Sequence, residues 1–312
     1  MPDQEHSRPP TPELGVQLPA WQWPLDVGEL RAWVQGAEEL GFEWLGMPDH
    51  VFYAYDTPQR PPAVYPGGTI QHEALTVLAW IAGFTQRAAL TTSVLVLPQR
   101  QAALVAKQAA EIDVLSGGRL RLGVGIGWQE AEFDGLGRTF DDRGARIESD
   151  IAVLRACWAD EPISLETPNE RIDQLSMLPK PTRRGGPPLL YGGVHPRGID
   201  RAARLCDGWI AMTRFDPARA SDTVGALHER LRVHGRDPAT FPLQATIPLT
   251  DDDEALASTL HGYLDAGLHW LGLHLPGLHG PGGHGIERRL GVDAHLARLA
   301  TVRRDIWPAV SA

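Results

Sequence analysis

The feature that most constrains the fold is an alternation repeated along the chain, in which short apolar runs are followed by amphipathic stretches with apolar residues at helical spacing. Apolar runs of about four to eight residues are typical of buried strands, and their alternation with helices is typical of parallel sheets. The strands are expected at residues 14–18, 42–47, 89–97, 120–126, 189–191, 208–212, 243–249 and 268–274. The helices are expected at residues 26–40, 72–84, 102–115, 143–158, 196–205, 218–234, 252–266 and 286–304.

Eight strand–helix pairs favour an α/β fold of the (β/α)8 TIM-barrel type, because closing eight parallel strands into a barrel removes both edges of the sheet. An open, doubly wound sheet is the alternative. Longer connections predict insertions after strands 2, 4 and 8; the first spans residues 48–71, and residues 161–187 belong to the second. We expect residues 1–11 to form a flexible tail and residues 12–312 a single barrel domain.

Charge and composition exclude several classes of function. The net charge is −10 and no stripe of basic residues occurs, which argues against a nucleic-acid partner, because phosphate binding needs clustered positive charge. No apolar run approaches the roughly 18 residues of a membrane helix, and the polar, proline-rich residues 1–11 do not look like a signal peptide. Cys157 and Cys206 are too few for a disulfide framework or a zinc cluster. We therefore expect a cytoplasmic protein that binds no membrane.

Alternate glycines, Gly123, Gly125 and Gly127, end the fourth expected strand and are followed by Trp128. Because alternate residues of a strand point to the same side, these glycines leave one face without side chains. We interpret the bare face as a slot for a planar cofactor, and close packing inside the barrel is the alternative. The run is not a dinucleotide fingerprint, which needs G-x-G-x-x-G with a helix opening at once.

A glycine pair, Gly192 and Gly193, lies between the fifth expected strand and a helix that begins with Pro196. Glycines before a helix let backbone N–H groups converge, and the helix dipole favours an anion there. We expect a phosphate group to bind at Gly192, Gly193 and Val194, with Arg197 nearby as a counter-charge. A plain strand-to-helix turn that needs glycine dihedrals is the alternative interpretation.

Asp49 and His50 lie where the second expected strand ends, at the end of a barrel where active sites are built. A histidine beside a carboxylate can exchange a proton near neutral pH, so His50 is the candidate catalytic residue. A purely structural histidine is the alternative. The loop that follows carries Phe52, Tyr53 and Tyr55, which are candidate contacts for an apolar or aromatic substrate.

Four histidines recur every five residues around the last expected strand, namely His269, His274, His279 and His284. This spacing fits no strong zinc pattern, so we expect no metal site. A metal-dependent barrel hydrolase built on these histidines is a minor alternative. His274, at the end of the strand, is a further candidate substrate contact.

Several short runs match one known family as a combined pattern within residues 14–212. They are MPDHV at 47–51, LPQR at 97–100, LVAKQAA at 104–110, DVLSGGRL at 113–120, LGVGIGW at 122–128, EF at 132–133, RG at 143–144, LPKP at 178–181, YGG at 191–193 and DGW at 207–209. Together they resemble the bacterial luciferase-like superfamily, and within it the branch that uses the deazaflavin coenzyme F420.

The resemblance implies a (β/α)8 barrel with insertions that holds a flavin or deazaflavin at the carboxyl ends of its strands. His50 matches the family's candidate proton donor or acceptor at the ring system. Ser93 and Val94 fall where similar proteins carry a non-prolyl cis peptide that backs the ring. The positions that match the family's cofactor-binding residues are Asp49, His50, Ser93, Val94, Gly125, Gly127, Trp128, Gly192, Gly193 and Val194.

The chain also departs from the family pattern. Gln101-Ala102 replaces the usual Asn-Pro, and Ser149 replaces a common Glu, so we expect the ion pair of that Glu to be absent. Trp128 stands where similar dehydrogenases of sugar phosphates place a catalytic Glu, and Ala54 stands near the position of their Trp. These departures argue against a sugar-phosphate substrate.

The resemblance and the residues together predict an oxidoreductase that moves a hydride between F420 and a small organic substrate, apolar or aromatic, while His50 exchanges the proton. Reduction of an unsaturated bond or imine is favoured over oxidation of an alcohol. The alternatives are an FMN-dependent luciferase-like monooxygenase and a non-catalytic flavin-binding barrel protein. Similar monooxygenases tend to carry Glu-His-His where this chain has Asp49-His50-Val51. Family members are often homodimers, but the sequence defines no interface.

Overall fold

Eight parallel strand positions close into a barrel in the computed structural model, which describes residues 10–19, 26–60, 65, 67–211, 217–274 and 291–311. The ring runs β1-β2-β3-β5-β8-β9-β10-β11 and returns to β1, and the short strand β4 continues β3 beside β5. The strands are β1 (Glu13–Gln17), β2 (Trp44–Met47), β3 (Ala89–Thr92), β4 (Leu95–Val96), β5 (Leu120–Gly125), β8 (Leu189–Gly192), β9 (Gly208–Ala211), β10 (Leu243–Pro248) and β11 (Trp270–His274). The predicted (β/α)8 barrel is confirmed.

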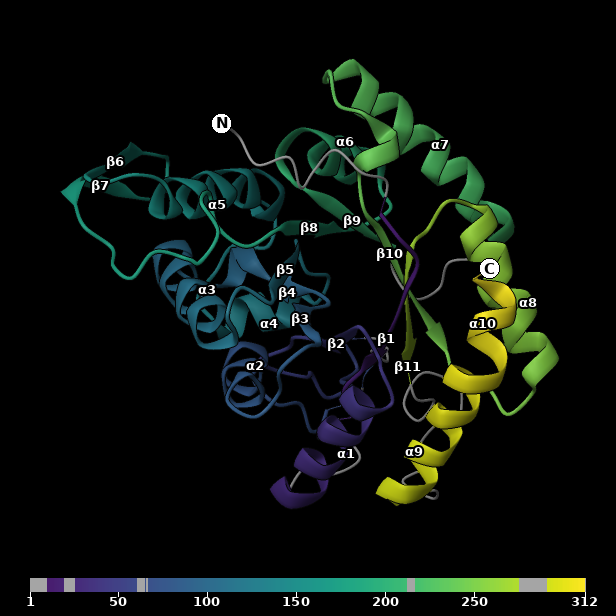
Figure 1. Ribbon diagram of the computed structural model, residues 1–312. Helices are drawn as coiled ribbons and strands as arrows, with labels where there is room; N and C mark the ends of the chain where they lie inside the picture. Colours follow the sequence, from purple (N-terminus) through teal and green to yellow (C-terminus); the bar gives the residue numbers. More distant parts are fainter. Residues whose placement is uncertain are drawn as a thin grey trace.

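Helices surround the barrel and cover the outer faces of its strands (Figure 1). They are α1 (Val27–Glu39), α2 (Ala74–Ala82), α3 (Ala102–Ser116), α4 (Glu130–Gly135), α5 (Arg143–Trp158), α6 (Pro196–Leu205), α7 (Pro217–Val233), α8 (Asp253–Asp265), α9 (Val292–Thr301) and α10 (Trp307–Val310). Local sequence sets several of their ends. Asp26 caps α1 by accepting a hydrogen bond from the Glu29 N–H at 2.9 Å, and Pro196 occupies the first turn of α6.

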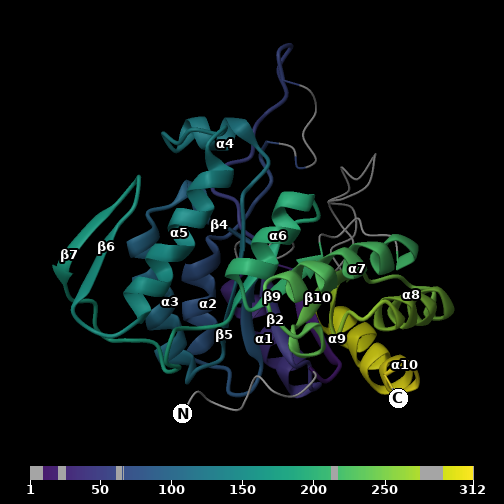
Figure 2. The same cartoon turned by 90° about the horizontal axis from the view of Figure 1, so that it is seen from above.

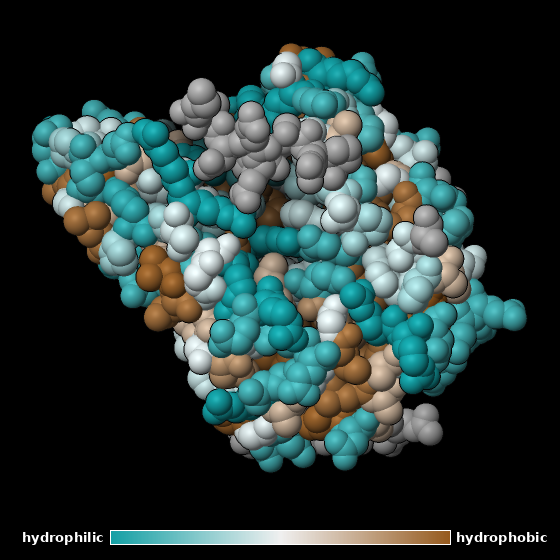
Figure 3. Space-filling view, in the orientation of Figure 1, coloured by the Kyte–Doolittle hydropathy of each residue, from teal (hydrophilic) through white to brown (hydrophobic). Residues whose placement is uncertain are grey.

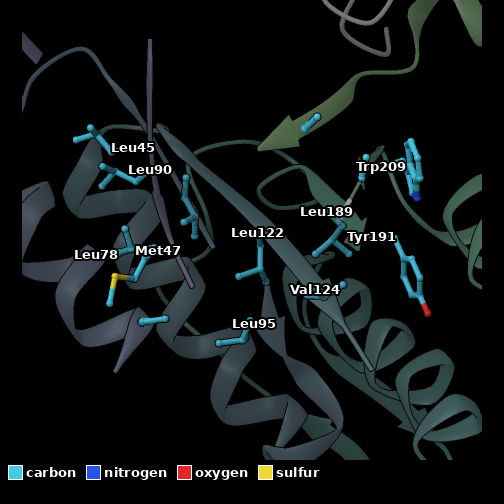
Figure 4. Close-up of a cluster of buried hydrophobic side chains, with 14 of the residues drawn as sticks. Leu45, Met47, Leu78, Leu90, Leu95, Leu122, Val124, Leu189, Tyr191 and Trp209 are labelled. Carbon is cyan, nitrogen blue, oxygen red and sulfur yellow. The ribbon is translucent and has the colours of Figure 1, made fainter. Parts of the chain in front are cut away.

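Apolar side chains that alternate along the strands form the core between barrel and helices. Figure 4 shows Met47 of β2 beside Leu78 of α2, with Leu122 and Val124 of β5 in the same layer. These side chains are fully buried. Burial of this layer is the main force that holds the helices on the barrel.

A tryptophan side chain of β2 fills the interior of the barrel. A Cβ atom added to Gly15 or Gly272 would lie 2.0 or 2.1 Å from the ring of Trp44, so this ring occupies the space that the two glycines leave. At the amino ends of the strands, Arg121 makes an ion pair with Glu13 at 2.7 Å, and its guanidinium lies 3.8 Å from the ring of Trp270. The interior is therefore a packed core, not a pore.

The second expected insertion lies within the described residues, and so does the first except for residues 61–64 and 66. The segment after β2 and helix α4 stand together above one end of the barrel (Figure 2). Residues 161–187, for which no element was expected, contain an antiparallel hairpin of β6 (Ile163–Glu166) and β7 (Arg171–Leu175), which projects from the barrel in Figure 1. Residues 1–9 of the expected tail at 1–11, and residues 275–290 of the third insertion, lie outside the described residues.

The surface in the orientation of Figure 1 is mainly hydrophilic, with apolar atoms in scattered areas (Figure 3). None of the helices that the structure describes is both long enough and apolar enough to cross a bilayer.

Candidate active site

A cavity of about 600 Å³ opens at the carboxyl ends of β2, β4, β5 and β8. The ten cofactor positions expected from the sequence all line it: Asp49, His50, Ser93, Val94, Gly125, Gly127, Trp128, Gly192, Gly193 and Val194. Four segments that are far apart in the sequence are thus brought to one cavity. This is the end of the barrel at which TIM-barrel enzymes build their active sites.

His50 is held by Glu132, a buried residue of α4 that the sequence did not single out as a site residue. The Nδ1 atom of His50 lies 2.9 Å from Oε2 of Glu132, and the other carboxylate oxygen accepts hydrogen bonds from the N–H groups of Val51 and Phe52 at 2.6 and 3.1 Å. Burial alone would raise the pKa of the Glu132 carboxyl, but the hydrogen bond and the charge of His50, together with the other hydrogen bonds to the carboxylate, outweigh it and lower this pKa. An ionised Glu132 fixes the proton on Nδ1 and leaves Nε2 for a ligand.

The Asp49 carboxylate, next to His50, is hydrogen-bonded to other protein groups. Its Oδ2 accepts a hydrogen bond from the Val96 N–H at 2.9 Å, and its Oδ1 accepts one from Arg100 at 2.7 Å. Arg100 also contacts Glu73 at 3.1 Å. Burial raises the pKa of the Asp49 carboxyl, and the charge of Arg100 opposes this rise only in part. The hydrogen bond from Val96 ties the end of β2 to β4, and together with the Arg100 ion pair it fixes the backbone that carries His50.

On their Cβ side, the glycines of β5 and Gly127 make room for protein atoms, although Gly125 and Gly127 also line the cavity. A Cβ atom at Gly123 would lie 2.1 Å from the Thr92 carbonyl oxygen, and one at Gly125 would lie 2.7 Å from Val94. The space beside Gly127 is taken by Val96 and by a phenylalanine of α4. The interpretation of a bare slot was therefore wrong, and close packing explains the spacing. The expected cis peptide between Ser93 and Val94 is confirmed, and this bulge between β3 and β4 forms part of the cavity wall.

One end of the cavity is basic. Arg143, Arg197 and Arg201 line it beside Gly192 and Gly193. The Nε atom of Arg143 is buried without a hydrogen-bond partner. Arg197 is exposed and pairs with no carboxylate of the described residues. A helix amino terminus beside two cations that have no carboxylate partner among the described residues fits a phosphate-bearing cofactor.

The positive charge of Arg201 is balanced by an ion pair. Its Nε lies 2.8 Å from Glu148, which also contacts Arg204 at 2.5 Å. The expectation of an absent ion pair considered only Ser149, and Glu148, one residue earlier, provides an ion pair in this helix. Arg143 is held differently, since its guanidinium lies 3.6 Å from the ring centre of Phe140.

Aromatic rings surround His50. Its ring centre lies 4.9 Å from that of Tyr53, 5.8 Å from that of Tyr65 and 5.5 Å from that of Trp128. Burial raises the pKa of the Tyr53 hydroxyl above its ordinary value, so this hydroxyl stays protonated. A neutral aromatic wall favours an apolar or aromatic ligand at His50.

The other expected substrate contacts lie elsewhere. Phe52 borders a second, smaller hollow of about 230 Å³, and Tyr55 is 69% exposed. His274 is buried at the end of β11, in register with Pro248 of β10, and does not line the cavity.

No cluster of three or more metal-binding side chains occurs in the part of the chain that the structure describes. His279 and His284 of the spaced histidines lie outside that part. Cys157 and Cys206 are buried, and burial raises the pKa of the Cys206 thiol to about 12. Both cysteines are therefore unreactive core residues.

Sequence comparison relates the chain to known proteins. A family model for luciferase-like monooxygenases matches residues 6–301. An F420-dependent hydroxymycolic acid dehydrogenase of Mycobacterium tuberculosis is 29% identical over 80% of this chain and 67% of its own length. An FMNH2-dependent dimethylsulfone monooxygenase of Pseudomonas fluorescens is 33% identical over 60% of this chain and 48% of its own.

Solved structures show the same fold. An F420-dependent secondary alcohol dehydrogenase, in complex with an F420–acetone adduct, superposes with a TM-score of 0.77 at 16% identity. The superposition covers 96% of this chain and 99% of that protein. At this identity the likeness shows the barrel architecture alone.

Proposed function

The chain belongs to the luciferase-like monooxygenase family, and from this premise we propose that it is an F420-dependent oxidoreductase acting on an apolar or aromatic organic substrate. The family and its relatives make it an oxidoreductase of this superfamily. The choice of F420 is supported by relatives named for that coenzyme and by the sequence Asp49-His50-Val51, which differs from the Glu-His-His of similar monooxygenases.

The observation that carries the proposal is the His50–Glu132 pair, at 2.9 Å, in the wall of a cavity whose other end is basic. When bound, the deazaflavin would donate or accept a hydride at its C5 carbon. His50 gives or takes the balancing proton through Nε2, because Nδ1 is engaged with Glu132. Tyr53 and Trp128 keep water from the reacting region and favour an apolar substrate.

Particular residues would hold the coenzyme. Arg143 and Arg197 have free hydrogen-bonding capacity for its phosphate, near the backbone N–H groups of Gly193 and Val194. Val94, on the bulge, presents an apolar surface to a ring system. The basic end fits the anionic part of F420 and would also fit the phosphate of FMN.

Calorimetric titration of the purified protein with oxidised F420 and, separately, with FMN tests the proposal. We expect submicromolar binding of F420 and much weaker binding of FMN. Reduced F420 should then transfer a hydride to members of a panel of enones and imines, and His50→Asn should slow this transfer by about 100-fold or more. Binding of neither compound would contradict the proposal, and binding of F420 without any turnover would favour a non-catalytic binding protein.

A second candidate is a monooxygenase that uses reduced FMN and oxygen. The relatives named as FMNH2-dependent dimethylsulfone monooxygenases favour it. It predicts the opposite preference in the titration, together with oxygen uptake that requires reduced FMN and the organic substrate.

A further inference from the structure

Exposed apolar side chains are concentrated on the loops that begin at the cavity, and two of them, Trp128 and Val194, line it. Six of the thirteen large apolar residues that are exposed within the described chain lie on the loops after β2, β5 and β8. These six are Val51 (42% exposed), Phe52 (48%), Tyr55 (69%), Ile70 (45%), Trp128 (44%) and Val194 (48%), and we call them the apolar rim. Apolar patches on a protein surface mark binding sites, because folding alone gains nothing from leaving such side chains in water.

We propose that the apolar rim binds the hydrocarbon part of a lipophilic substrate, one whose reacting carbon lies at His50 and whose alkyl chain or ring system extends out of the cavity. The inference rests on the proposed function, because it concerns the substrate of the same site. It goes beyond a small apolar substrate, since it adds a binding surface outside the cavity.

The rim is held in place by the residue that orients His50. Glu132 accepts the N–H groups of Val51 and Phe52 at 2.6 and 3.1 Å, and Gln129 donates to the Phe52 carbonyl at 2.6 Å. The Phe52 ring lies against α4, where a Cβ atom at Gly135 would come within 3.2 Å of it. The rim therefore presents its apolar side chains on a fixed backbone, and binding a ligand needs little ordering.

One residue of the rim reaches the reaction centre. Trp128 belongs to both, since it lines the cavity, is half exposed, and has its ring centre 5.5 Å from that of His50 and 6.1 Å from that of Tyr65. The separate hollow of about 230 Å³ between Phe52 and α4 gives an apolar chain a place to lie. A substrate can thus contact aromatic surface from His50 to the rim.

Charge distinguishes a single lipophilic molecule from a membrane as the occupant. Asp56, Glu130 and Asp134 are exposed among the rim residues or on the adjacent α4, and the chain carries a net charge of −10. Surfaces that dock on anionic bilayers carry clustered Lys and Arg instead. Arg60 and Arg197 are also exposed beside the rim, so the charge around it is mixed, which favours a dissolved or carried lipophilic substrate over an anionic bilayer.

A chain-length series tests the inference without turnover. The F420-loaded protein is titrated with methyl ketones from butan-2-one to decan-2-one, followed by calorimetry. Burial of each methylene strengthens binding by up to about fourfold, so affinity should rise at least tenfold across the series. The double variant Phe52→Ser/Tyr55→Ser should lose most of this rise, whereas Leu115→Ser/Val233→Ser, which removes comparably exposed residues from α3 and α7, should keep it.

The outcomes separate the two proposals. If F420 binds but affinity is independent of chain length, or rises equally in the rim variant, the rim inference is overturned and the proposed function stands. If the protein binds the long ketones through the rim but binds no F420, the proposed function fails and the apolar subsite stands. Cosedimentation with phosphatidylglycerol vesicles that depends on Phe52 and Tyr55 would overturn the inference in favour of a membrane-docking surface.

Discussion

At the scale of single residues, Glu132 sets the orientation of the His50 ring and the nitrogen that carries its proton. Glu132→Gln keeps the shape of the side chain and one oxygen acceptor but removes the charge that fixes the proton on Nδ1. We expect hydride transfer to fall by about tenfold or more, because a misoriented or wrongly protonated histidine exchanges its proton poorly. The single-turnover rate of hydride transfer with F420, measured as a function of pH in wild type and variant, tests this. Glu130→Gln, an exposed carboxylate of the same helix, should leave the rate unchanged.

The same variant has an expected stability signature. Folding lowers the pKa of Glu132, so its charge stabilises the folded protein above the ordinary glutamate pKa, and this contribution is lost as the pH falls through the lowered value. The difference in unfolding free energy between wild type and Glu132→Gln should therefore shrink in acid. A difference that stays constant from neutral to acid pH would show that Glu132 acts through packing alone.

Arg143 supports a second prediction at this scale. Its Nε is buried without a partner, so an anion at the basic end of the cavity would satisfy it. Arg143→Met should weaken F420 binding by about tenfold or more, as expected for a charge-assisted hydrogen bond. Arg184→Met removes an exposed arginine remote from the cavity and is the matched control. Equal affinities of both variants in calorimetry would exclude Arg143 from the anion site.

The sequence could predict the residues of the site only in part. Asp49, His50 and the glycines were recognised because they end strands or belong to runs that resemble a known family. Glu132 was not, because it is 82 positions from His50 along the chain and no local pattern links them. Arg143 was quoted only as part of a matching run, since its unpartnered Nε depends on packing around α5 that no periodicity reveals.

At the scale of elements, the barrel depends on glycines that admit a large ring. Gly15→Ala would place a Cβ atom 2.0 Å from Trp44 inside the barrel, and we expect it to destabilise the protein by about 1–3 kcal/mol. Gly225→Ala is the opposite case, because Gly225 lies exposed in α7 with no atom near its added Cβ. It should stabilise by about 0.5–1 kcal/mol through helix propensity. Urea unfolding measures the change in unfolding free energy that each variant causes. A change in the same direction in both variants would contradict this account.

Elements with a buried face were predictable, and those without one were not. β5 and α5 were expected almost at their observed bounds, because their apolar residues recur with the period of the element. The β6–β7 hairpin was missed, because most of β7 is exposed and its sequence Arg-Ile-Asp-Gln-Leu carries little apolar alternation. The glycine repeat of β5 was recognised but misinterpreted, since only the neighbouring bulge shows what fills the space.

At the scale of the whole molecule, the two ends of the barrel have different roles. The amino end carries ion pairs such as Glu13–Arg121 at 2.7 Å and Glu43–Arg303 at 2.6 Å. The carboxyl end carries the cavity, the apolar rim and the long loops. This division follows from the fold, because strand-to-helix loops all emerge at the carboxyl end. The homodimer expected from the resemblance stays a prediction, which light scattering of the purified protein would test.

The stability of the whole molecule should depend on one buried carboxyl of α5. Asp150 is 1% exposed and its Oδ2 lacks a hydrogen-bond partner. Burial, with the charges of Glu170 and Asp142, raises its pKa to about 7 against the opposing charges of Arg146 and Arg138. Between the ordinary aspartate pKa and pH 7, the folded protein therefore keeps a proton on Asp150 that the unfolded chain has lost. The free energy of unfolding falls as the pH rises through this range, by up to about 4 kcal/mol.

Asp150→Asn removes this loss, because the amide stays neutral at every pH. We expect the variant to melt several degrees above wild type at pH 8, where the buried carboxylate is charged, and close to wild type at pH 4, where it is protonated. Asp160→Asn, which alters an exposed carboxylate just beyond α5, should have little effect at either pH. A gain from Asp150→Asn that is the same at both pH values would mean that packing, and not the buried charge, sets the stability at this position.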